Sequence, residues 1–152
     1  MIRAGAVGRY GLLAAALCLS WGVVRAESAA RDKFYVEDIK AAMALHIERT
    51  NDAQGVFHLI DDKTGEPLAL RFVKIHDPVR QIDASTYFAC TDFAVVGHED
   101  KLYDIDFWLR PAGDRLEVYD TRVHKEPRKS LLYGWYKQPR YTFVNDRVVE
   151  LY

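Results

Sequence analysis

YDIDFWLRPAGDRLEVYDTRVHK, residues 103–125, decides the fold of this chain. Apolar and polar residues alternate on both sides of the segment PAGD at 111–114, and such alternation is typical of β-strands with one buried face. Two such runs separated by a short turn that contains glycine indicate an antiparallel hairpin. The stretch therefore predicts the central hairpin of an antiparallel sheet.

The residues before this hairpin add one helix and more strands. Apolar residues recur at spacings of three and four between about 34 and 50, which places Val36, Ile39, Met43 and Ile47 on one helical face. From about residue 56 onward, short apolar runs alternate with turn residues, without the helices that a parallel sheet would need. We therefore predict an α+β fold, in which one N-terminal helix packs on a curved antiparallel β-meander.

The C-terminal stretch has a less regular pattern. Residues 126–140, EPRKSLLYGWYKQPR, are basic and aromatic and are predicted to form a loop. The following YTFVNDRVVELY is predicted to form a hairpin around Asn145 and Asp146, because these residue types tolerate the positive φ of a tight turn.

Residues 1–26 have the three parts of a secretory signal peptide. Arg3 and Arg9 make a positive start, an apolar run follows from Leu12 to Val24, and Ala26 is the small residue before a cleavage site. The apolar run is shorter than the roughly 20 residues that a membrane span needs. We expect cleavage after Ala26, an exported protein (periplasmic or secreted), no membrane span after cleavage, and a single domain over residues 27–152.

Charge and cysteine content narrow the classes of function. Without the signal segment, 18 Lys and Arg stand against 22 Asp and Glu, so the mature chain has a net charge of −4. Nucleic acid is therefore not an expected partner, because phosphate binding requires a basic surface. Cys90 is the only cysteine after Cys18 leaves, so the mature chain forms no internal disulfide. Its apolar surroundings predict a buried structural thiol.

The layout of one helix and a meander resembles the cystatin-like and NTF2-like rolls. The strand YFACTDF and the hairpin YDIDFW…LEVYDTRVHK are similar to those of small exported bacterial proteins of unknown function, over about residues 33–125. This resemblance implies a layout and brings no catalytic residues. The QxVxG loop motif of the cystatins is absent, so protease inhibition by that route is not expected.

A set of charged residues is expected on the sheet face away from the helix. Strict alternation gives this candidate ligand pocket the following residues: Asp92, Asp104, Asp106, Asp120, Arg122 and His124. The favoured interpretation is cross-strand pairing, worth roughly 0.2–1 kcal/mol per pair. A polar ligand pocket is the second interpretation. In a third, one aspartate is a general base, His124 is the acid, and Arg122 binds an anion.

No motif in the sequence identifies a cofactor, a metal site or a catalytic residue. The histidines have no HxH or HExxH spacing, and neither a glycine-rich phosphate loop nor GxSxG is present. We therefore predict no metal, no cofactor and no catalytic residue, and the enzyme interpretation remains an alternative without a motif.

Residues 124–143 combine basic and aromatic side chains. Trp, Tyr and Arg dominate interface hot spots, so this segment is a candidate interface, with these residues: Arg128, Lys129, Trp135, Tyr136 and Arg140. Alternatively, the aromatic residues pack over the end of the sheet. The sequence thus predicts an exported binding or accessory module, whose partner is an unknown protein or a small-molecule ligand.

Overall fold

The computed structural model of the chain describes residues 33–151, so the predicted signal peptide and its cleavage after Ala26 lie outside the described residues. In this part of the chain one helix precedes nine strands. Their bounds are α1 (Val36–Thr50), β1 (Phe57–Ile60), β2 (Pro67–Ile75), β3 (Arg80–Gln81), β4 (Tyr87–Val95), β5 (His98–Ala112), β6 (Arg115–Ser130), β7 (Gly134–Pro139), β8 (Tyr141–Val144) and β9 (Arg147–Glu150).

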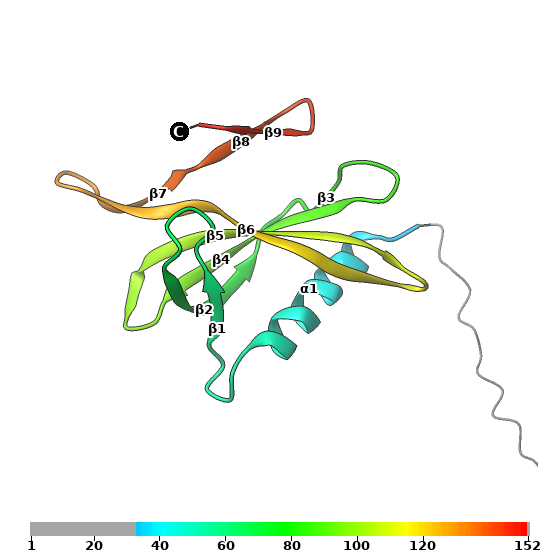
Figure 1. The fold of residues 1–152 in the computed structure, drawn as a ribbon, viewed down its shortest axis with the longest axis horizontal. Coiled ribbons are helices and arrows are strands. Elements are labelled where there is room, and N and C mark those ends of the chain that lie inside the picture. The colour runs from blue at the N-terminus through cyan, green and yellow to red at the C-terminus, as the bar shows by residue number, and fades with distance from the viewer. Residues whose placement is uncertain (1–32, 152) are drawn as a thin grey trace, which may run out of the picture.

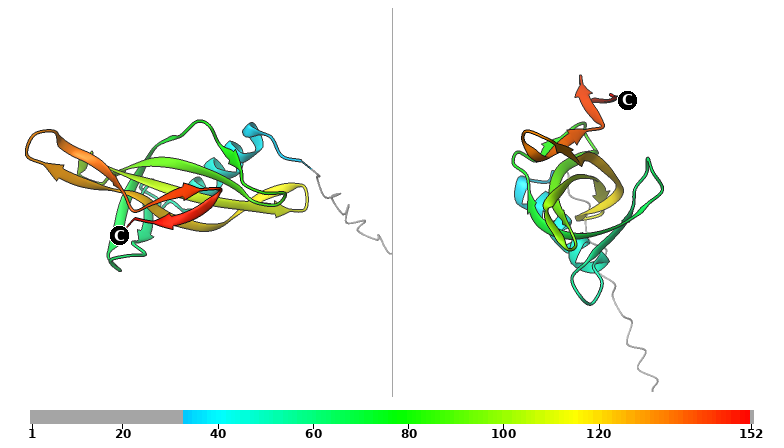
Figure 2. Two further views of the ribbon diagram at one scale, coloured as in Figure 1. Left: turned by 90° about the horizontal axis from the view of Figure 1, so that it is seen from above. Right: turned by 90° about the vertical axis from the view of Figure 1, so that its left-hand side faces the viewer.

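The strands form an antiparallel meander. Strands β1, β2, β4, β5, β6 and β7 are neighbours in that order, β3 pairs with β4, and β8 pairs only with β9. The sheet is strongly curved, and α1 lies along one of its faces (Figures 1 and 2). The predicted α+β fold is therefore confirmed, and the helix begins at Val36, two residues later than expected.

The apolar face of α1 packs on the sheet as its spacing predicts. Ile39, Met43 and Ile47 are the buried helix residues. Beneath the helix, the ring of Phe57 lies 5.0 Å from that of Phe93 and 6.0 Å from that of Phe107. These three rings come from β1, β4 and β5, so they tie the sheet into one core.

Two bulges in β6 change which side chains face the core. Between the pairs Ile105–Val123 and Asp104–Lys125, His124 is the extra residue. Between the pairs Leu109–Val118 and Trp108–Asp120, Tyr119 is the extra residue. Strict alternation would place Leu116 on the face of Asp120, whereas Leu116 is in the core cluster. An extra residue in one strand shifts the alternation by one position, which explains the difference.

The predicted loop at residues 126–140 is wrong. β6 continues to Ser130, and β7 pairs with it from Gly134 to Pro139. Gly134 has a φ of 71° and closes the turn between them. The ribbon projects beyond the sheet (Figure 1), so neither of its faces needs a regular apolar pattern. The second C-terminal prediction is confirmed, because Asn145 and Asp146 have φ values of 51° and 58° in the turn between β8 and β9.

Replacing Phe107 by alanine tests the core. Phe107 is fully buried against two other rings, so Phe107→Ala is expected to lower the free energy of unfolding by about 3–5 kcal/mol. Phe72 is 44% exposed, and Phe72→Ala is the matched control with an expected loss of about 1 kcal/mol. Urea unfolding of both variants measures the difference. Equal losses would contradict the packing described here.

Candidate functional site

Three aspartates are buried on the sheet face opposite α1. Asp92 comes from β4, and Asp104 and Asp106 come from β5, where Asp104 is the direct register partner of Asp92. Asp104 and Asp106 are fully buried and Asp92 is 5% exposed. A buried carboxylate is costly unless it is paired and hydrogen-bonded. The side chains around them therefore determine what this face can do.

Asp92 and Asp104 are paired with two lysines in what we call the lysine cluster, which consists of His76, Asp92, Asp104, Lys125 and Lys137. Lys137 Nζ lies 2.5 Å from Asp92 Oδ1, and Lys125 Nζ lies 2.5 Å from Asp104 Oδ2. His76 Nε2 lies 3.0 Å from Asp92 Oδ2. Burial opposes the charge of Asp92, but its bonds to Lys137 and His76 lower its pKa overall. Lys74 Nζ also lies 4.0 Å from Asp92 Oδ2, so the ammonium groups of three lysines lie within ion-pair distance of these two carboxylates.

Asp106 belongs to a second group, the thiol cluster, which consists of Cys90, Asp106, His124 and Tyr141. The Tyr141 hydroxyl donates to Asp106 Oδ2 at 2.5 Å, and its ring stacks on His124 with centroids 4.7 Å apart. His124 Nδ1 lies 3.4 Å from Asp106 Oδ1 and 3.6 Å from Cys90 Sγ. Burial and the nearby Asp106 charge raise the pKa values of both Cys90 and Tyr141.

The thiol cluster does not have the geometry of a nucleophilic triad. In a triad the histidine contacts the nucleophile through one ring nitrogen and the orienting acid through the other. Here Cys90 and Asp106 both approach Nδ1 of His124. The raised pKa of Cys90 also keeps the thiol protonated, whereas a nucleophilic cysteine needs a lowered one. The Cys90 sulfur and an Asp106 oxygen therefore both lie beside one nitrogen of His124. This arrangement does not connect the thiol to the carboxylate through the two nitrogens of the ring.

Arg140 joins distant parts of the chain in a buried ion cluster. Its Nη1 and Nη2 donate to the two carboxylate oxygens of Asp61 at 2.7 and 2.6 Å, and its Nε donates to Glu126 Oε2 at 2.7 Å. Asp61 lies between β1 and β2, whereas Glu126 lies in β6. Only 4% of Arg140 is exposed. The guanidinium is therefore not available to a partner on the predicted interface.

The remaining predicted site residues lie at the margin of this face or on the hairpin. Asp120 and Arg122 pair with each other at 2.8 Å and are partly exposed. Arg128 pairs with Glu126. Trp135 lies under the ammonium groups of Lys101 and Lys129, 4.7 and 5.8 Å from its ring centre. The structure thus brings Asp92, Asp104, Asp106 and His124 together, whereas Arg122, although it is the register partner of Asp106, forms its ion pair with Asp120.

Several members of the two clusters were not among the predicted pocket residues. They are His76, Cys90, Lys125, Lys137 and Tyr141. Regular hairpin spacing would place Val123 opposite Asp104, and the two bulges in β6 bring Lys125 to that position instead. No pattern in the sequence indicates that Lys137 and Tyr141 fold back over β4 and β5, since Lys137 lies within the segment that was predicted to be a loop and Tyr141 follows it.

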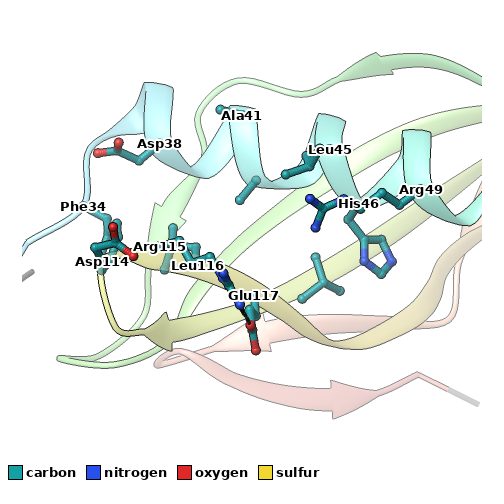
Figure 3. A pocket seen from close by; sticks show the side chains of 12 residues that line it. Phe34, Asp38, Ala41, Leu45, His46, Arg49, Asp114, Arg115, Leu116 and Glu117 are labelled. Atoms are coloured by element: carbon teal, nitrogen blue, oxygen red, sulfur yellow. Dashed lines mark hydrogen bonds and ion pairs between the residues drawn. The ribbon is translucent and has the colours of Figure 1, made fainter. Parts of the chain in front are cut away.

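A cavity of about 450 Å³ lies on the other side of the sheet, between α1 and the end of the β5–β6 hairpin. Figure 3 shows Leu45, His46 and Arg49 on the helix facing Leu116 and Glu117 on β6. Burial lowers the pKa of His46. Its ring stands edge-on to Phe107 at 5.7 Å. The cavity is therefore a gap beside the core, and it has no contact with the two clusters of the opposite face.

Comparisons with known proteins give no relative from which a function could be transferred. No family model matches the chain, and neither a curated protein nor a solved structure matches it. Among the described residues, no helix is long and apolar enough to cross a membrane.

Removing the Tyr141 hydroxyl tests the thiol cluster. Tyr141→Phe leaves the buried Asp106 without its donor, and the expected loss in the free energy of unfolding is about 1–3 kcal/mol. Tyr119 is 47% exposed, so Tyr119→Phe is the control and should change stability by no more than about 0.5 kcal/mol. Denaturant unfolding measures both variants. A Tyr141→Phe variant as stable as the control would contradict the described contact.

The Arg140 ion cluster predicts a loss of stability in acid. The contacts with Arg140 and with backbone N–H groups outweigh the effect of burial, and they lower the pKa of Asp61 from 3.8 to about 2. The unfolded chain therefore takes up this proton first as the pH falls. The contribution of Asp61 is complete above pH 3.8 and is lost as the pH falls toward 2.

Asp61→Asn removes this titration. The free energy of unfolding of the wild-type chain should fall by about 2 kcal/mol more than that of Asp61→Asn between pH 4 and pH 2. Asp100 is exposed and is not a member of the Arg140 ion cluster, so Asp100→Asn is the matched control with a wild-type profile. Parallel profiles for wild type and Asp61→Asn would contradict the assignment.

Proposed function

We propose that this chain is a small exported binding module that docks on a partner protein through the β6–β7 hairpin. The observation that carries the proposal is the apolar tip of this hairpin. Leu131 is fully exposed, and Leu132 and Tyr133 are 84% and 83% exposed. Single exposed apolar residues are ordinary, but three in succession at the end of a projecting ribbon are typical of a contact surface.

The tip is an ordered turn. The β6–β7 ladder runs without a register shift from Lys125–Pro139 to Ser130–Gly134. The Ser130 hydroxyl accepts hydrogen bonds from the N–H groups of Leu132 and Tyr133 at 3.2 and 3.4 Å. The ribbon reaches beyond the rest of the sheet (Figure 2). Preorganised apolar side chains lose less conformational entropy on binding, which favours a specific partner.

The base of the hairpin supplies the other parts of an interface. A groove of about 450 Å³ lies beside it and includes Leu68, Val95, Tyr103 and Trp135 among its lining residues. Exposed Arg128 and Lys129 lie on the same ribbon. Aromatic residues and arginine beside an apolar groove are the usual composition of a hot spot. The proposed interface therefore has these residues: Arg128, Lys129, Leu131, Leu132, Tyr133, Trp135 and Tyr136.

Export and the finer fold type are part of the proposal. The positive, apolar and small-residue segments of residues 1–26 support export with cleavage after Ala26, to the periplasm or the medium. The helix on one face of a curved antiparallel sheet supports a roll of the cystatin-like or NTF2-like kind. The enzyme alternative has less support, because Arg122, its expected anion-binding residue, is already paired with Asp120 at 2.8 Å.

Site-specific photo-crosslinking in the exporting cell tests this function. A photo-reactive residue at position 136 should give a discrete product with a second protein, and one at position 119 should not. Tyr136 and Tyr119 are similarly exposed, at 45% and 47%. The double variant Leu131→Ser/Leu132→Ser should lower the yield of the product about tenfold.

Two controls make the result specific. Ile60→Ser/Val73→Ser changes two exposed apolar residues elsewhere, 63% and 47% exposed, and should leave the yield unchanged. The tip variant should keep its free energy of unfolding within about 0.5 kcal/mol of wild type. A product that survives the tip change would overturn the proposal. So would a product with lipid or with a second copy of this chain in place of another protein.

A further inference from the structure

We propose that Cys90, Asp106 and His124 bind one divalent transition-metal ion of the zinc class on the polar sheet face. This site is independent of the hairpin interface and would stand if that interface failed. Its three residues come from β4, β5 and β6, at the centre of the sheet.

The spacing of the donor atoms matches tetrahedral coordination. Cys90 Sγ, Asp106 Oδ1 and His124 Nδ1 all lie within 4.8 Å of one another. Zinc–ligand bonds of about 2.3 Å to sulfur and about 2.0–2.1 Å to nitrogen or oxygen place tetrahedral S and N ligands about 3.6 Å apart, and N and O ligands about 3.4 Å apart. The corresponding distances are 3.6 Å and 3.4 Å. Two of the three donor–donor distances therefore suit a tetrahedral ion, and the distance from the Cys90 sulfur to the Asp106 carboxylate is at most 4.8 Å.

A buried oxygen without a hydrogen-bond partner provides independent support. Asp106 is fully buried, and among the described residues its Oδ1 atom has no hydrogen bond of ordinary geometry and has the His124 ring nitrogen at 3.4 Å. Its Oδ2 atom accepts from Tyr141, which fixes the carboxylate with Oδ1 toward His124. Second-shell hydrogen bonds of this kind orient the ligands of metal sites. Buried polar atoms are almost always paired, and a cation held between Oδ1, the imidazole and the thiol would complete the pairing of this oxygen.

The two clusters differ in charge, and the difference decides where a cation binds. His76, Asp92 and Asp104 also bring three donor atoms together, but the ammonium groups of Lys125 and Lys137 already neutralise these carboxylates. In residues 33–151, no lysine or arginine nitrogen lies within 4 Å of Asp106. A divalent ion together with one carboxylate, one thiolate and a neutral imidazole would be neutral, which removes the cost of the buried charge.

The ligand types specify the class of metal. Sulfur and imidazole ligands favour Zn²⁺ and neighbouring ions such as Co²⁺, whereas Ca²⁺ and Mg²⁺ require oxygen ligands. On binding, the Cys90 thiol loses its proton to solvent and its sulfur bonds to the metal. His124 keeps 12% of its side chain exposed, so the ion has a path from solvent. Three protein ligands leave the fourth position to water or to a ligand of the partner.

Cobalt titration of the full chain tests the site. The background carries Cys18→Ser, so that Cys90 is the only thiol. After treatment with a chelator, one equivalent of Co²⁺ should produce a thiolate-to-cobalt charge-transfer band and the visible bands of a tetrahedral complex, and Zn²⁺ should displace both. Cys90→Ser should abolish the charge-transfer band, and His124→Gln should weaken Co²⁺ binding at least about tenfold.

The lysine cluster supplies the matched control. His76→Gln changes a histidine of similar surroundings that is not a proposed ligand, and it should keep the wild-type spectrum and affinity. Circular dichroism checks that each variant is folded. If a ligand variant does not fold, the titration of the wild-type chain alone tests the proposal. The absence of a charge-transfer band at one equivalent would overturn the proposal. A His76→Gln variant that loses the band while His124→Gln keeps it would also overturn it.

Discussion

The burial of three carboxylates on neighbouring strands is the constraint around which this structure is arranged. Asp92, Asp104 and Asp106 lie on the central strands β4 and β5, where water cannot solvate them. Each therefore needs a partner from another element. Those partners come largely from the last third of the chain, namely His124 and Lys125 on β6, Lys137 on β7 and Tyr141 on β8. Arg140 provides a further long-range contact, because its guanidinium joins Glu126 of β6 to Asp61 in the turn between β1 and β2.

The two faces of the sheet have different roles. The face beneath α1 is an ordinary core of Phe57, Phe93 and Phe107, and it stabilises the fold through apolar burial. The opposite face contains charges whose removal from water costs about as much as their pairing returns. Pairing of this kind contributes little net stability, but the loss of one partner leaves a buried charge unpaired, which is strongly destabilising. The pairing also anchors β7 through Lys137, which fixes the root of the hairpin that carries the proposed interface.

The sequence predicts the fold more completely than the site. Helical spacing identifies α1, and alternation identifies the β5–β6 hairpin and most of the meander. The two bulges at Tyr119 and His124 are not encoded in any short pattern, since they depend on how β6 is held against β5. Alternation nevertheless collects Asp92, Asp104 and Asp106 on one face. The partners from β7 and β8 could not be predicted, because a long-range contact has no local signature and β7 has no fully buried residue that would give it an apolar pattern.

The segment after Pro139 holds the buried acids in place, and the fold depends on it. The most direct test compares the urea unfolding of two shortened chains, one ending at Pro139 and one ending at Val144. The longer chain keeps Arg140 and Tyr141 and should unfold cooperatively, although it lacks β9. The shorter chain leaves Asp61, Glu126 and Asp106 without these partners and should not fold cooperatively. Two chains with the same free energy of unfolding would contradict the account.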